Sequence, residues 1–203
     1  MFENKQNTEK NENISLGELF VRGAYDVVSV AVSAVVVVLL VFVFGFRMVG
    51  VVQSSMVPTL ENGNSVIVTA FMPKVKTNDI VIITVPQEND PLVKRVIATG
   101  GQTIRINFES GEIWIDGELK VEPFIRADTH VIDRFPLNID DHTGEIVVPD
   151  DSVFVMGDNR NESRDSRSSL GTVRTEYLLG KVLFRVRPFG KWNVYASTFG
   201  NQS

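Results

Sequence analysis

The stretch from Val27 to Phe46 reads VVSVAVSAVVVVLLVFVFGF, and it divides the chain into parts that meet different solvents. Its twenty residues carry no charge, and only Ser29 and Ser33 are polar. At a rise of about 1.5 Å per residue, a helix of this length is about 30 Å long, which matches the hydrocarbon core of a bilayer. The sequence therefore predicts one transmembrane helix over residues 27–46.

A cleavable secretory signal peptide is the competing interpretation of this run. Such a peptide has a basic start, an apolar core of about 7 to 15 residues and a small-residue cleavage site. Here the run is longer, follows a polar tail at residues 1–26, and leads into Phe46-Arg47-Met48, which offers no small-residue site. The pattern favours a retained membrane anchor.

Length and composition limit what the rest of the chain can be. After the anchor, residues 47–203 are enough for one compact domain. Because 25 acidic residues outnumber 20 basic ones, no basic excess is available to neutralise phosphates, so we expect no nucleic-acid partner. The absence of cysteine excludes disulfides and a thiol nucleophile, and with only two histidines we expect no metal and no cofactor.

Beyond the anchor, short runs rich in Val and Ile alternate with Gly, Asn, Asp and Pro, which predicts a mostly β domain of antiparallel strands. Asp116-Gly117 is the sharpest hairpin signal. The irregular stretch 123–144 is expected to be a small insertion or cap, and Asp165 to Tyr177 is a weakly patterned helix candidate. The expected strands are 65–70, 79–85, 92–99, 103–107, 112–115, 145–148, 152–156 and 181–187.

Two side chains suggest nucleophilic chemistry. Ser55 begins the segment Ser55-Met56-Val57-Pro58-Thr59-Leu60 nine residues after Phe46, so its hydroxyl is expected near the membrane surface. A free hydroxyl is a poor nucleophile until a base takes its proton. Lys94 lies in the apolar strand 92–97, where burial would lower its pKa from about 10.4 and leave more of the amine neutral.

Each feature alone has a plainer interpretation. Lysine is rarely buried, so Lys94 can be a solvated strand residue, and Ser55 can be a turn hydroxyl. A third segment, GDNRNESRDSR at residues 157–167, follows an apolar strand and is dense in hydrogen-bonding groups. It is either a solvated loop or a scaffold that orients a catalytic pair.

Together these segments resemble the type I signal peptidases, a family of membrane-anchored serine proteases with a Ser-Lys dyad and a signal-peptidase-like β-fold. The resemblance implies that Ser55, rather than Ser54, is the nucleophile, because the family has the attacking serine immediately before Met. It implies that Lys94 is the general base that later protonates the leaving amine. The segments that carry it are the anchor, Ser55–Leu60, Asn78–Val81, Lys94–Val96 and residues 157–167.

The resemblance also suggests supporting residues. Ser163 falls where the family has a serine hydrogen-bonded to the lysine, and Asp158 and Arg160 match structural members of the loop. Gln53 stands where some relatives have a serine that helps to hold the oxyanion. A carboxamide N–H can also donate there, beside the expected backbone N–H of Ser55.

One further departure is Asn78, where the family often has a glycine. Asparagine also adopts the left-handed backbone region, so we expect a tolerated turn variation there.

The resemblance implies substrates and topology as well. The expected partners are the lipid bilayer and secretory preproteins whose signal peptides end in small residues, roughly Ala-X-Ala. An extended segment can add to a strand edge beside shallow apolar pockets, and Val51, Val52 and Val93 are expected along that groove. Because signal peptides are cut on the outer face, residues 1–26 are expected in the cytoplasm and residues 47–203 outside the membrane.

Two alternatives stay open at this point. A self-cleaving repressor-type Ser-Lys protease has related β-architecture but would be soluble, so the anchor speaks against it. A catalytically silent, membrane-tethered β-module that only binds secretory peptides would share the anchor and the β-pattern. A cleavage assay on a preprotein separates this module from a protease.

Overall fold

The structure, a computed structural model, describes residues 16–71, 74–86, 88–125, 145–168 and 170–188. The chain forms two compact units, residues 1–44 and 45–203. His130 and His142 lie outside the described residues, as does most of the predicted insertion at residues 123–144.

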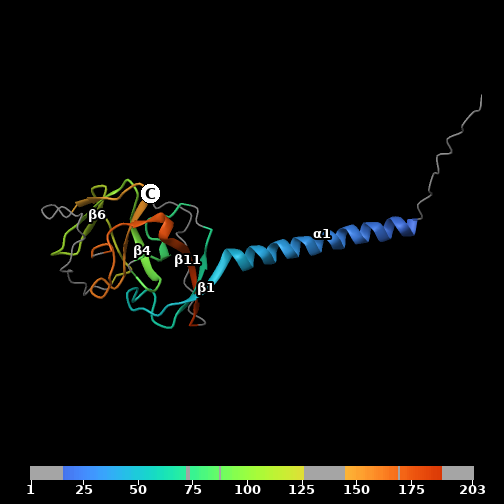
Figure 1. Ribbon diagram of the computed structural model, residues 1–203, viewed down its shortest axis with the longest axis horizontal. Coiled ribbons are helices and arrows are strands. Elements are labelled where there is room, and N and C mark those ends of the chain that lie inside the picture. Colours follow the sequence, from blue (N-terminus) through green and yellow to red (C-terminus); the bar gives the residue numbers. More distant parts are fainter. Residues whose placement is uncertain (1–15, 72–73, 87, 126–144, 169, 189–203) are drawn as a thin grey trace, which may run out of the picture. The chain divides into compact units, whose positions relative to one another are not determined.

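The first unit consists of α1 (Leu16–Gly45), a single uninterrupted helix (Figure 1). Its part from Leu19 to Gly45 is long and apolar enough to cross a membrane, and its apolar side chains are exposed. The predicted helix is confirmed, although it begins within the predicted tail and ends one residue early. Gly45, the last residue of α1, belongs to the second unit, where a Cβ on it would overlap the Phe71 ring.

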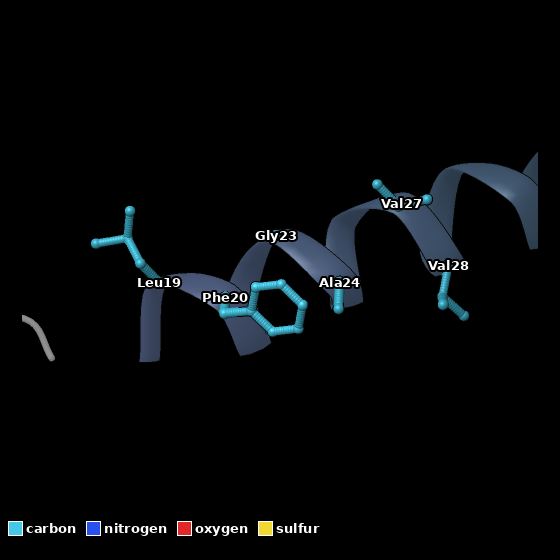
Figure 2. Close-up of a pocket in the computed structure, with 6 residues that line it drawn as sticks. All are labelled: Leu19, Phe20, Gly23, Ala24, Val27 and Val28. Carbon is cyan, nitrogen blue, oxygen red and sulfur yellow. The ribbon is translucent and has the colours of Figure 1, made fainter. Parts of the chain in front are cut away.

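A shallow hollow lies on the first turns of α1, over the small residues Gly23 and Ala24. Figure 2 shows the side chains that line it, which are aliphatic apart from the Phe20 ring. The hollow is therefore part of the apolar helix surface. Its lining residues are Leu19, Phe20, Gly23, Ala24, Val27 and Val28.

The second unit is built on a seven-stranded sheet in the order β1-β2-β11-β3-β4-β9-β10, with antiparallel pairing throughout. Its order brings β11, from the end of the described chain, between β2 and β3. The strands are β1 (Phe46–Gly50), β2 (Ser65–Thr69), β3 (Ile80–Ile83), β4 (Leu92–Thr99), β9 (Ser152–Met156), β10 (Val173–Arg174) and β11 (Leu178–Arg187).

A second, four-stranded antiparallel sheet has the order β7-β6-β5-β8. Asp116 and Gly117 join β6 to β7 with φ of 53° and 84°, the positive values of a type I′ hairpin turn, so the predicted hairpin is confirmed. Figure 1 shows β6 at the opposite end of this unit from β1. The strands are β5 (Thr103–Ile106), β6 (Ile113–Ile115), β7 (Glu118–Leu119) and β8 (Glu145–Val147).

The central strands β3, β4 and β9 of the seven-stranded sheet are buried on both faces, which explains their continuous apolar runs, whereas the edge strand β1 is largely exposed. All four residues of β3 are buried, and they alternate between two clusters. Ile80 and Ile82 pack in one cluster with Met56 and Leu60, whereas Val81 and Ile83 pack in the other. A third cluster joins β4 and β9 to the small sheet. A charged residue on β4 is consequently buried unless it lies at the rim.

The mostly antiparallel β-fold predicted from the sequence is confirmed, with two local differences. The sequence missed β1, which directly follows the anchor, and the two-residue β10. The helix candidate from Asp165 to Tyr177 was wrong, since its end forms β10 and the 3₁₀ turn η1 (Thr175–Tyr177). The Asp165 carboxylate and Ser166 hydroxyl instead accept backbone N–H groups, which competes with helix formation.

Candidate active site

Ser55 lies in the loop between β1 and β2, and its neighbours hold it in place. Met56 and Leu60 are buried in the core, and the Leu60 N–H donates to the Met56 carbonyl at 2.8 Å. Ser55 is buried, whereas Ser54 is exposed. The loop therefore turns the Ser55 side chain toward the protein and leaves Ser54 at the surface.

The Ser55 loop packs directly on the loop at residues 157–167. The Asn159 N–H donates to the Ser55 carbonyl at 3.0 Å, and Asn159 Nδ2 donates to the Ser54 carbonyl at 3.2 Å. A Cβ on Gly157 would overlap both the Ser55 carbonyl oxygen and Ser163 Oγ. The structure thus brings Ser55 and Ser163 together at Gly157, and only glycine fits between them.

One buried hydroxyl at this point, that of Ser55, has no hydrogen-bond partner among the described residues. Ser163 is also buried, and a hydrogen bond from its hydroxyl contributes to the lowered pKa of Asp165. Leaving a buried polar group without a partner costs about 1 to 3 kcal/mol, so such a group in a native structure requires an explanation. A hydroxyl that awaits a reacting group provides one.

Lys94 is buried in the middle of β4, with 1% of its surface exposed. It pairs with Val81, and its neighbour Arg95 pairs with Met156, the residue before Gly157. Burial lowers the pKa of Lys94 from 10.5 to about 8, although the negative charges of Asp165, Glu88 and Asp158 act in the opposite direction. At pH 7 about one amine in eleven is then neutral, against about one in 3,000 for an ordinary lysine.

Asp158 joins β4 to the Ser55 loop. Arg95, the neighbour of Lys94, donates to Asp158 from Nε at 2.8 Å and from Nη2 at 2.7 Å, and both side chains are buried. Thr59 Oγ1 donates to the same carboxylate. Arg95 also lies over the Phe124 ring, 3.9 Å from its centroid. Asp158 is therefore placed to hold the strand of Lys94 against the loop of Ser55.

Both backbone polar groups of Gly157 are held by buried side chains. Its N–H donates to Asp165 at 2.9 Å, and its carbonyl accepts from Arg160 Nε at 3.0 Å. Arg160 also makes a bidentate pair with Glu122 at 2.9 and 2.6 Å. Burial opposes ionisation of Asp165, but the charge and hydrogen bonds of Arg167 and the Gly157 N–H keep the pKa of Asp165 below its ordinary value.

A groove of about 320 Å³ lies next to this site. Val52, Gln53 and Val93 line it, together with the end of β1, whereas Val51 is 2% exposed and packs in the core. No hydrogen bond from the Gln53 carboxamide or from the Ser55 backbone N–H ends on the residues that the structure describes. These two donors remain available at the side of Ser55.

Several residues of the site were missed by sequence reasoning. Thr59 lies in the segment Ser55–Leu60, so its closeness to Ser55 in the sequence could have suggested that it supports the site. Arg95 was named only as part of the segment Lys94–Val96, without a role of its own. Glu122 gave no signal, since it is 38 residues from its partner Arg160 and lies in a stretch without a recognisable motif.

Known proteins resemble this chain over most of its length. Residues 24–187 match the family model described as "Signal peptidase, peptidase S26". Signal peptidase I of Bacillus licheniformis is 31% identical over 82% of this chain and 90% of its own, and signal peptidase I S of Bacillus subtilis is 32% identical over 90% and 97%.

A solved structure, signal peptidase I from Enterococcus faecalis, is 26% identical with a TM-score of 0.44, covering 54% of this chain and 97% of its own. The family match and the identity to the Bacillus enzymes are sufficient to assign the chain. It belongs to the signal peptidases of peptidase family S26 and is a serine endopeptidase with an N-terminal helix that fits a membrane anchor.

Proposed function

We propose that this signal peptidase removes signal peptides from secretory preproteins with Ser55 as nucleophile and Lys94 as general base. The observation that supports this most directly is a buried lysine, its pKa lowered to about 8, whose neighbour Arg95 pairs with Met156 just before Gly157. The Ser55 carbonyl oxygen and Ser163 Oγ both lie at Gly157, and the buried Ser55 hydroxyl has no partner among the described residues. A lysine base requires burial, because only the neutral amine can accept a proton.

The proposed reaction begins with neutral Lys94. Its Nζ takes the proton of Ser55 Oγ while that oxygen attacks the scissile carbonyl carbon. The resulting ammonium gives the proton to the leaving amine as the peptide bond breaks and an ester forms on Ser55. Lys94 then takes a proton from water as the water oxygen attacks the ester carbon. When the ester bond breaks, the ammonium returns this proton to Ser55 Oγ, and the signal peptide leaves with a free carboxyl group.

Asp165 stabilises the charge that Lys94 acquires in each half of this cycle. The pKa of Asp165 lies below its ordinary value, so it is ionised at neutral pH, and its charge favours the ammonium form. Ser163 is proposed to contact Lys94, as the family resemblance implies. Its hydroxyl is buried and lies at Gly157, next to the Ser55 carbonyl, which supports that role.

The oxyanion of the tetrahedral intermediate is proposed to accept from the Ser55 N–H and the Gln53 carboxamide. Removal of one such donor typically lowers kcat by about 10² to 10³. Gln53→Ala should therefore lower kcat with little change in KM, and Gln53→Ser should restore part of the loss. An unchanged kcat in Gln53→Ala would remove Gln53 from the oxyanion hole.

Specificity for small residues of the Ala-X-Ala type is proposed to arise in the groove. Val52, Ile82 and Val93 contribute apolar walls, and β1 is an edge strand beside which an extended peptide can lie. Because the preprotein is cut on the outer side, we place residues 47–203 outside the membrane and residues 1–26 in the cytoplasm, with residues 27–46 as the anchor between them.

A cleavage assay tests the dyad. The full chain in detergent is incubated with a preprotein, and the new N-terminus is mapped by mass spectrometry. Ser55→Ala and Lys94→Ala should abolish cleavage, whereas Ser54→Ala, an exposed serine one residue away, should not. Wild-type cleavage by either dyad variant would exclude the assignment, and collapse after replacement of His130 and His142 would favour a Ser-His mechanism. A wild type that binds preproteins without cleaving them would support the silent-module alternative.

A further inference from the structure

The groove beside Ser55 has one charged side chain, Asp90. Val52, Ile82, Pro91 and Val93 give it apolar walls, and Gln53 is its only other side chain with a polar group. Asp90 is exposed and lies in the turn between β3 and β4. A peptide that fills this groove would therefore meet a single carboxylate.

Asp90 differs from the other carboxylate of the same turn. Glu88 Oε1 makes an ion pair with Arg164 Nη1 at 2.9 Å. No ion pair or hydrogen bond joins the Asp90 side chain to any residue that the structure describes, and the next residue, Pro91, has no backbone N–H to donate. The charge of Asp90 is thus open to an external cation.

The groove lies close to the proposed reaction centre. Gln53 is two residues before Ser55, and Val93 is the neighbour of Lys94. Four residues of extended chain span at most about 14 Å, so Asp90 is within that distance of Lys94. A substrate side chain within about four residues of the cut bond can therefore reach Asp90, and Lys and Arg have the length to do so.

We propose that Asp90 is a specificity-determining residue that selects a Lys or Arg side chain in the preprotein, within four residues of the cut bond. This inference rests on the proposed role of the groove as the substrate site. Exposed ion pairs contribute little free energy, so attraction of Lys and repulsion of Glu should together favour Lys by only about 3- to 10-fold in kcat/KM.

The test uses the full chain in detergent and a preprotein with Lys or Glu at each position from four before to four after the cut, apart from the two required small residues. The ratio of kcat/KM for Lys over Glu is measured within each enzyme variant, so differences in active fraction cancel. The wild type should favour Lys about 3- to 10-fold at one position. Asp90→Asn should lose this preference, Asp90→Lys should reverse it, and added salt should weaken it.

Glu109→Lys is the matched control. Glu109 is an exposed acid in the turn between β5 and β6 and does not line the groove, so it gives the same change in net charge elsewhere. It should keep the wild-type preference. No preference at any position, or a preference that survives in Asp90→Lys, would overturn the role of Asp90. A wild type that cleaves neither series would instead overturn the proposed function itself.

Discussion

Lys94→Met should raise the free energy of unfolding at neutral pH, and the cost of burying this lysine determines by how much. Its pKa falls from 10.5 to about 8, so holding the buried amine charged costs about 3 kcal/mol, at 1.36 kcal/mol per pH unit. Methionine has a similar length and no charge. The variant should be inactive and yet gain up to about 3 kcal/mol in the free energy of unfolding at pH 7.

The pH dependence separates this charge effect from packing. Below pH 8 the folded protein bears the full cost of the charged amine. Between pH 8 and 10.5 the unfolded chain binds more protons than the folded chain, so wild-type stability rises with pH, and above 10.5 the cost is gone. The advantage of Lys94→Met over wild type should therefore shrink by about 3 kcal/mol between pH 7 and pH 10.5.

Urea unfolding of the full chain in detergent, followed by tryptophan fluorescence, measures this difference. Any packing change that methionine introduces is present at both pH values and cancels in the comparison. Lys120→Met removes a partly exposed lysine and controls for the loss of one positive charge. If the advantage of Lys94→Met is the same at pH 7 and pH 10.5, Lys94 does not have a lowered pKa, and the proposed general base is wrong.

Three further predictions concern the same site. The value of kcat/KM should rise about tenfold per pH unit below pH 8 and then level off, because only neutral Lys94 accepts a proton. A value of kcat/KM that stays constant from pH 6 to pH 9 would contradict this. Gly157→Ala should reduce cleavage strongly, because the added methyl group overlaps Ser163 Oγ. Wild-type activity of this variant would show that the Ser55 loop and the loop at residues 157–167 can move apart without loss of cleavage. Asp158→Asn should lower the free energy of unfolding, measured in urea, by about 3 to 5 kcal/mol, because it leaves the buried Arg95 without its carboxylate partner. A decrease below about 1 kcal/mol would show that this ion pair does not stabilise the fold.

Much of the fold could be predicted because its signals are local. An apolar run of bilayer length predicts α1, and short runs rich in Val and Ile between turn residues predict most strands of both sheets. Asp116-Gly117 and Asn78 adopt the positive φ values that their residue types favour. β1 was missed because its first residue, Phe46, ends the predicted helix and Val49 is its only β-branched residue.

The candidate residues of the site could be named from sequence, but their surroundings could not. The family resemblance selected Ser55 over Ser54, because the family has the attacking serine immediately before Met, and the structure buries the first and exposes the second. The groove contains Val52 and Val93 but not Val51, because the side chain of Val51 turns into the core. Which face a loop side chain takes depends on packing partners that are distant in the sequence.

The sequence by itself determined the membrane-length helix and the antiparallel β-domain, because these follow from composition and local patterns, and its resemblance to the type I signal peptidases named Ser55 and Lys94 as candidates. Only the tertiary structure decided that Lys94 is buried, that the Ser55 backbone carbonyl and the Ser163 hydroxyl meet at Gly157, and that Asp90 lines the groove. The physical reason is that burial, pKa and ion pairing arise from groups on separate strands and loops, which only the folded chain brings within a few ångströms of one another.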